Sequence, residues 1–139
     1  MSRGFLLDLN VILDVLLDRK PHVTSAAALW SRVERGDVTG YLAAHGITTI
    51  HYLAHRARGK RFARQTVEDL LSVFEVAAVD QEIIRQALSL PLADFEDAVC
   101  AACATAANCE AIVTRDPAGF RGSPVTPIDP ATALAWLNS

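Results

Sequence analysis

Short apolar runs alternate along the chain with longer segments in which apolar residues recur at helical spacing. The short runs predict strands over residues 5–7, 38–44, 74–79, 111–114 and 125–128. The longer segments predict helices over residues 10–17, 22–35, 47–57, 66–74, 81–88, 94–107 and 131–137. Strands that alternate with helices predict an α/β fold, in which helices cover both faces of a mainly parallel sheet.

Acidic residues stand where several of these helices begin. Asp80, Asp94 and Asp129 can each accept the free backbone N–H groups of a first helical turn, so we predict that they are N-caps. Asp97 lies three residues after Asp94, where a carboxylate also suits the positive end of the helix dipole. Residues 99–107 are small and apolar almost all round, which predicts a buried helix.

The composition indicates one folded domain over residues 1–139. Hydrophobic residues make up 51% of the chain, and we find no internal repeat or interdomain linker. No apolar run could cross a bilayer and the start of the chain lacks a signal-peptide pattern, so we expect a cytoplasmic protein without membrane contacts. Cys100 and Cys103 form a C-x-x-C within the alanine-rich helix, but no second pair follows. We therefore expect buried packing residues rather than zinc ligands.

Charge is distributed unevenly. The formal net charge is −3, and a net acidic domain is a poor generic binder of nucleic acid. A basic cluster nevertheless occupies nine residues: Arg56, Arg58, Lys60, Arg61 and Arg64. It either holds an RNA backbone or forms a solvated connection between two helices. His51 and His55 have a spacing that can bind a metal, but no third ligand is evident, so we expect ordinary helix histidines.

Four carboxylates occupy strand ends or helix starts in three separate segments: Asp8, Asp94, Asp97 and Asp116. The carboxyl ends of parallel strands share one edge of a sheet, so these side chains can converge there. Clustered carboxylates repel one another unless a cation binds between them. Oxygen ligands without Cys or His select Mg²⁺ or Mn²⁺, which can polarise a phosphoryl oxygen and activate a water molecule.

Three segments resemble the acidic motifs of the PIN-domain family. They are Asp8-Leu9-Asn10-Val11-Ile12-Leu13-Asp14, Asp94-Phe95-Glu96-Asp97-Ala98 and Thr114-Arg115-Asp116, and their order and spacing also fit. The resemblance is closest to single-domain bacterial members, many of which are VapC-like toxins of toxin–antitoxin pairs. It implies a three-layer α/β/α sandwich and Mg²⁺- or Mn²⁺-dependent hydrolysis of RNA phosphodiesters. It also implies a cognate antitoxin and a homodimer.

The resemblance implies particular roles for residues of this chain. Asp8, Asp97 and Asp116 would be the catalytic metal ligands, and Asp94 would be an additional ligand or a helper. Asn10 would orient Asp8 or contact the phosphate, and Thr114 would offer a hydroxyl at the same edge. The basic residues that would contact RNA are Arg56, Arg58, Lys60 and Arg61.

Two positions depart from the family pattern. Leu9 stands where members commonly have Thr or Ser, and Thr49 stands where many have a Glu. Loss of that Glu would weaken metal binding or leave the site to one ion, and Asp94 or Glu96 would compensate.

Two other classes of function stay open. One is a degenerate PIN-like module that binds a protein partner without catalysis, which Leu9 and Thr49 favour. The other is a phosphoacceptor or phosphatase domain with an Asp after its first strand. That phosphatase pattern needs a second Asp where this chain has Asn10, and a receiver needs a late-strand Lys where it has Arg115.

Overall fold

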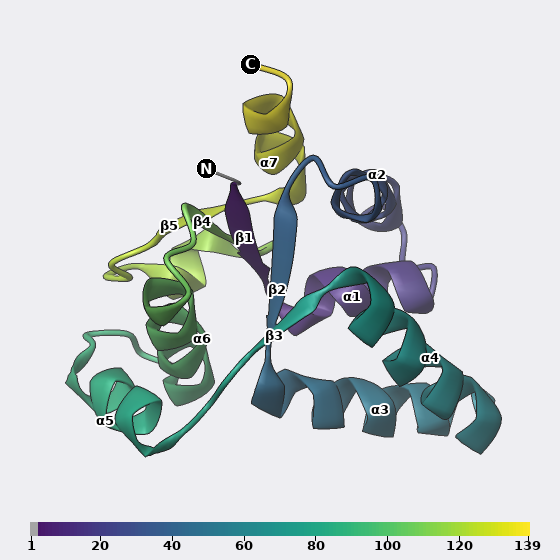
Figure 1. Cartoon of the computed structure of the whole chain (residues 1–139), viewed down its shortest axis with the longest axis horizontal. Coiled ribbons are helices and arrows are strands. Elements are labelled where there is room, and N and C mark those ends of the chain that lie inside the picture. The colour runs from purple at the N-terminus through teal and green to yellow at the C-terminus, as the bar shows by residue number, and fades with distance from the viewer. Residues whose placement is uncertain (1–2) are drawn as a thin grey trace.

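The computed structural model describes residues 3–139, and five parallel strands form its central sheet (Figure 1). The strands are β1 (Gly4–Leu7), β2 (Thr39–Ala43), β3 (Glu75–Ala77), β4 (Ala111–Val113) and β5 (Thr126–Ile128). Their order across the sheet is β3-β2-β1-β4-β5, and every neighbouring pair is parallel. The predicted parallel sheet is confirmed, with β1 at its centre and β4 beside it.

Helices cover both faces of this sheet. They are α1 (Leu9–Leu16), α2 (Val23–Glu34), α3 (Ala44–Arg58), α4 (Lys60–Val73), α5 (Gln81–Ser89), α6 (Phe95–Ala106) and α7 (Pro130–Leu137), with a 3₁₀ turn η1 (Pro117–Phe120) after β4. Figure 1 shows α5 and α6 on one side of the sheet and α1 and α2 on the other. The three-layer α/β/α sandwich is therefore confirmed. No helix within residues 3–139 is long and apolar enough to cross a membrane.

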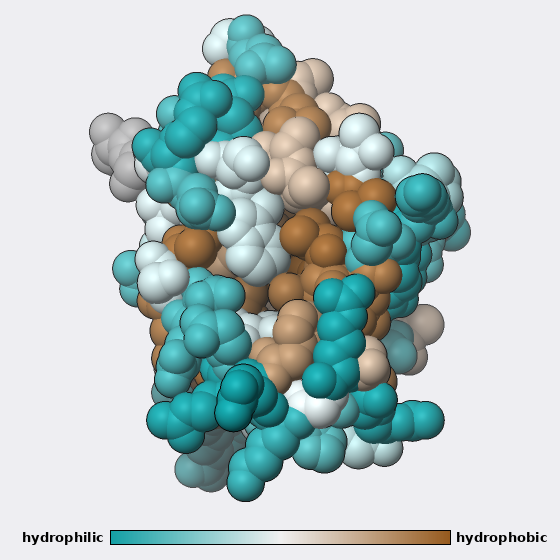
Figure 2. Space-filling model, turned by 90° about the vertical axis from the view of Figure 1, so that its right-hand side faces the viewer, coloured by the Kyte–Doolittle hydropathy of each residue, from teal (hydrophilic) through white to brown (hydrophobic). Residues whose placement is uncertain are grey.

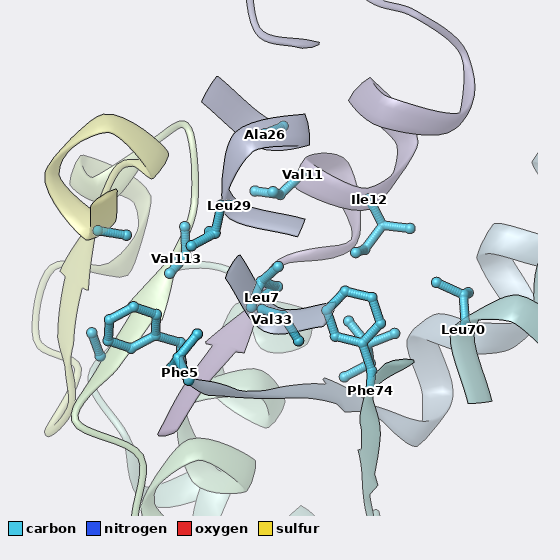
Figure 3. Close-up of a cluster of buried hydrophobic side chains, with 14 of the residues drawn as sticks. Phe5, Leu7, Val11, Ile12, Ala26, Leu29, Val33, Leu70, Phe74 and Val113 are labelled. Carbon is cyan, nitrogen blue, oxygen red and sulfur yellow. The ribbon is translucent and has the colours of Figure 1, made fainter. Parts of the chain in front are cut away.

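Alternation along β1 divides the interior into two apolar clusters. Phe5 and Leu7 point toward α1 and α2, where Figure 3 shows them among Val11, Ile12 and Leu29. Leu6, between them in sequence, faces the opposite side and packs with the small residues of α6. The prediction of a buried alanine-rich helix is confirmed, because residues 98–104 of α6 are all buried. Small side chains let this helix approach the sheet closely.

The predicted caps are also present. The carboxylates of Asp80, Asp94 and Asp129 each accept the backbone N–H of the residue three positions later, at 2.8–3.0 Å. Each satisfies one of the free donors of a first helical turn. Cys100 and Cys103 are buried as free thiols, as the packing interpretation predicted.

The connection between α3 and α4 differs from the prediction. We expected a helix to begin at residue 66, after the basic cluster, but α4 begins at Lys60. Gly59, with a φ of +91°, is the only residue between the two helices. Lys and Arg are good helix formers, and Ala63 on the inner face of α4 is completely buried. The basic cluster is therefore largely helical instead of forming a loose connection.

Candidate active site

Asp8 and Thr114 lie together at the carboxyl edge of the sheet. Asp8 follows β1, and its backbone N–H donates to the carbonyl of Val113 in β4 at 2.9 Å. Thr114 follows β4 and is buried, and its hydroxyl donates to Asp8 Oδ2 at 3.1 Å. The parallel pairing of β1 with β4 therefore brings together two residues separated by more than a hundred positions.

The Thr114 hydroxyl also fixes the start of the next segment. The backbone N–H of Asp116 donates to Thr114 Oγ1 at 3.2 Å, where the chain turns into η1. Thr114 thus links the backbone of Asp116 to the Asp8 carboxylate. The supporting position predicted for Thr114 agrees with this geometry.

The start of α6 brings a third carboxylate to the same region. Asp94 Oδ1 accepts the backbone N–H of Asp97 at 3.0 Å, so the cap fixes the first turn of the helix. Asp94 itself is exposed, and Asp97 is half-buried. The cap leaves the Asp97 side chain free for another partner.

Gly119 shows that Asp97 and Asp116 face a common space. A Cβ atom placed on Gly119 would lie 3.1 Å from Asp116 Oδ2 and 3.6 Å from Asp97 Oδ2. No side chain fills this gap, because the residue there is glycine. Two carboxylates from different segments therefore point into the same opening.

The pKa shifts of two of the acids reflect the charges around them. Burial raises the pKa of Asp97 to about 6, and the negative charges of Asp94, Asp8 and Asp116 add to the effect. Burial also raises the pKa of Asp8, against the opposing effects of the Thr114 hydroxyl and the Arg115 charge. Both shifts mean that negative charge in this site lacks full compensation from the protein.

The donor set suits a hard divalent cation. Carboxylate and hydroxyl oxygens lie together at this edge, and burial raises the pKa of the Cys100 thiol, which disfavours its charged form. Within residues 3–139, however, no three Asp, Glu, His or Cys side chains stand close enough to hold an ion as they are placed. The fit to a hard cation therefore rests on the chemistry of these oxygen donors.

A buried ion pair beneath the site was not predicted. Asp14 in α1 is almost fully buried, and its Oδ1 lies 3.4 Å from Arg115 Nη1 and 3.6 Å from Arg19 Nε. Arg115 stands between Thr114 and Asp116, so this pair connects α1 to the segment that carries the third acidic motif. An acid on the apolar face of the predicted helix was the signal that a partner was required.

The remaining predicted residues lie around or away from the acids. The backbone N–H of Asn10 is close enough to the Asp8 carboxylate to stabilise its charged form. Thr49 is half-buried in α3 and faces the same general side as Gly46, which adjoins Leu9. Arg56, Arg58, Lys60 and Arg61 lie at the far end of α3 and the start of α4, away from the sheet edge (Figure 1).

Comparison with known proteins identifies the family. The sequence profile of the PIN domain matches residues 4–118, so this chain belongs to the PIN-domain family. A comparison with curated proteins gives no match.

Solved structures share the fold at low sequence identity. DNA-bound VapBC from Salmonella typhimurium has a chain that is 17% identical, with a TM-score of 0.70 over 94% of this chain and 99% of that one. A toxin–antitoxin complex from Klebsiella pneumoniae gives 19% identity and a TM-score of 0.67, over 90% and 96%. VapC20 from Mycobacterium tuberculosis, a toxin that cleaves the sarcin–ricin loop, gives 17% and 0.63, over 78% and 86%.

Proposed function

We propose that this protein is a divalent-metal-dependent endoribonuclease and the toxin of a toxin–antitoxin pair. The observation that carries the proposal is the shared opening at Gly119, toward which Asp97 and Asp116 point. Membership of the PIN-domain family and the likeness to VapC structures support the same class of activity.

Mg²⁺ or Mn²⁺ would be held by Asp8, Asp97 and Asp116, with Asp94 as an additional ligand or a helper. A bound ion polarises a phosphoryl oxygen and makes a water molecule more acidic. The Thr114 hydroxyl holds Asp8 Oδ2 in place, and the buried Asp14–Arg115 pair fixes the segment before Asp116. Asn10, in the first turn of α1, would contact the phosphate or orient Asp8.

We extend the proposal to partners and location. Solved neighbours include toxin–antitoxin complexes, which supports a cognate antitoxin for this chain. Figure 2 shows an apolar patch on the face formed by the right-hand side of Figure 1, a kind of surface that a protein partner covers. We expect a homodimer that acts on RNA in the cytoplasm.

Cleavage of single-stranded or looped RNA tests this proposal. The purified protein should cut RNA with Mn²⁺ or Mg²⁺, EDTA should stop the reaction, and Asp8→Asn should abolish it. Asp129→Asn is the matched control. It also replaces one acid by an amide, but at the N-cap of α7, where the Asn side chain can still accept the backbone hydrogen bond. Equal cleavage by wild type and Asp8→Asn would show that another site or a contaminant is responsible.

A non-catalytic interaction module is the second candidate. It is favoured by Leu9 and Thr49, the two positions at which this chain departs from the family pattern. Titration with Mn²⁺ separates the two functions, because a non-catalytic module has no reason to bind the ion at the acidic edge.

A further inference from the structure

Positive and negative charges are distributed unevenly along this chain. Five of its 13 Lys and Arg residues lie within residues 56–64, which contain no acid. The rest of the chain has eight basic and 16 acidic side chains, so a formal charge of +5 in this short segment opposes −8 elsewhere. This segment is therefore the strongest concentration of positive charge along the chain, and the part that most attracts a polyanion.

The segment belongs to a helical hairpin that contains a groove. A cavity of about 640 Å³ lies between α3 and α4, lined by His51, His55, Lys60, Arg64, Val67 and Glu68. The imidazole rings of His51 and His55 are stacked, with centroids 6.3 Å apart. The groove therefore combines cationic side chains with flat aromatic surfaces, the two features that single-stranded nucleic acids bind.

The cations of the groove are available to a ligand. Arg64 Nε lies 3.3 Å from Glu68, but both side chains are more than half exposed, and such ion pairs are weak in water. Arg56 and Arg58 differ, because their guanidinium groups lie over the rings of Tyr52 and Phe62. Lys60 and Arg64 line the groove, whereas Arg56 and Arg58 do not, so the first two are the cations that a phosphate in the groove would meet.

The groove also has a direct connection to the acidic edge. Helix α3 begins at Ala44, immediately after β2, and β2 pairs with β1, the strand that Asp8 follows. At the rise of an α-helix, His51 and His55 lie about 10 and 16 Å along α3 from that start. Figure 1 shows α3 running outward from the sheet with α4 packed along it, and Figure 2 shows hydrophilic side chains over the lower part of this face.

We propose that the groove between α3 and α4 binds single-stranded RNA, with Lys60 and Arg64 on phosphates and His51 and His55 against bases. This inference rests on the proposed function, since the RNA is the substrate whose scissile bond would reach the carboxylates. It moves the predicted RNA contacts from Arg56 and Arg58 to the side chains that line the groove.

Binding of a labelled single-stranded oligoribonucleotide tests the proposal without cleavage. Fluorescence anisotropy is measured in an Asp8→Asn background, with the double variant Lys60→Ala/Arg64→Ala. We expect affinity to fall at least about fivefold at low salt, and the slope of log K against log salt to shrink by roughly 1.4, for two lost phosphate contacts. His51→Ala/His55→Ala should weaken binding without changing that slope, because stacking releases no counterions.

Two further variants make the test specific. Arg35→Ala/Arg85→Ala removes the same charge from exposed positions outside the hairpin and should bind within about twofold of the parent. Glu68→Gln removes the acid from the groove and should tighten binding. The side chains altered in the Lys60/Arg64 and His51/His55 double variants are all exposed, so the melting temperatures of these variants should match that of the parent.

The outcomes separate this inference from the proposed activity. Unchanged RNA affinity in Lys60→Ala/Arg64→Ala, or an equal loss in the Arg35/Arg85 control, would overturn the groove proposal even if the enzyme cleaves RNA. Conversion of a dimer to a monomer with unchanged RNA affinity would show instead that the groove is a contact between copies of the chain. Loss of RNA affinity in a protein that never cleaves would uphold the groove and reject the nuclease.

Discussion

Asp97 is the residue at which burial and like charge act most strongly together. Its first-turn position gives it a backbone hydrogen bond to Asp94, but the side chain extends toward Asp116 and the gap at Gly119. Folding therefore places a carboxylate where its charged form is disfavoured, and the pKa rises to about 6. Such a cost is retained at sites where a cation compensates it.

The raised pKa of Asp97 gives a pH dependence for metal binding. A proton and an ion compete for the carboxylate, so affinity for Mn²⁺ should fall about tenfold per pH unit below about pH 6 and level off above it. Calorimetry at pH 5.0, 6.0 and 7.5 measures this. An affinity that is the same at pH 5.0 and 7.5 would remove Asp97 from the ligand set.

The same shift affects the protein without metal. Between the ordinary pKa of 3.8 and about 6, the folded state holds a proton on Asp97 that the unfolded state has lost. The contribution of this group to stability therefore increases as pH falls from about 6 toward 4, and its destabilising effect is complete above 6. Asp97→Asn removes this pH dependence, so it is the control variant for the calorimetric measurements at the three pH values.

At the scale of elements, one buried ion pair joins α1 to the end of β4. Asp14 is 1% exposed and has two arginines within 3.6 Å, whose side chains are 33% and 30% exposed. Removal of the acid leaves partly buried positive charge without its partner, so Asp14→Ala should lower the free energy of unfolding by about 2 kcal/mol, less than for a fully buried pair. Urea denaturation measures it, with Asp37→Ala as the control, because Asp37 also pairs with two arginines but is itself exposed. A loss below 1 kcal/mol for Asp14→Ala would mean that water compensates the arginines.

Helix α3 offers a second test, at the position where the family resemblance leads us to expect a glutamate. Thr49 lies on the same helix as Gly46, which adjoins Leu9 next to Asp8. Thr49→Glu should add an oxygen ligand and lower the dissociation constant for Mn²⁺. Thr48→Glu, one position around the exposed side of the helix, should leave it unchanged. Equal constants for wild type and Thr49→Glu would show that position 49 points away from the acids.

The elements themselves followed from local pattern where pattern was strong. Asp80, Asp94 and Asp129 marked helix starts, because a capping acid acts within one turn. The start of α4 was wrong by six residues, because charged residues that form a helix look like a solvated loop until the burial of Ala63 is known. The Asp14–Arg115 pair and the Gly119 gap depend on contacts between segments, which local pattern does not encode.

At the scale of the whole molecule, the sheet is what turns separate motifs into one site. Parallel pairing of β1 with β4 brings Asp8 within hydrogen-bonding distance of Thr114, and the buried face of α6 sets the depth of Asp97. Neither the acids nor the strands alone would produce the convergence. We therefore expect the folded state, and not the unfolded chain, to bind the proposed divalent ion, which would couple metal binding to stability.

This coupling predicts how the protein melts. With free Mn²⁺ at about ten times its dissociation constant, stability should rise by roughly 1.4 kcal/mol. For a domain of this size, that is an increase in melting temperature on the order of 3–6 °C. Asp97→Asn removes one of the repelling charges and keeps the hydrogen bond to Asp94, because the backbone N–H is its donor. In EDTA, it should melt at or above the wild-type temperature.

The same variant should lose most of the rise that Mn²⁺ produces, and should lose cleavage. A purely structural Asp97 predicts the reverse, since the Asn variant would melt lower in EDTA while the response to metal stayed intact. Asp129→Asn controls for loss of an acid elsewhere, and its response to Mn²⁺ should equal that of wild type. Melting curves of the three proteins, each with EDTA and with Mn²⁺, distinguish the two roles of Asp97. Loss of a ligand removes the rise that Mn²⁺ produces without lowering the melting temperature in EDTA, whereas loss of a structural acid lowers the temperature in EDTA and keeps the rise.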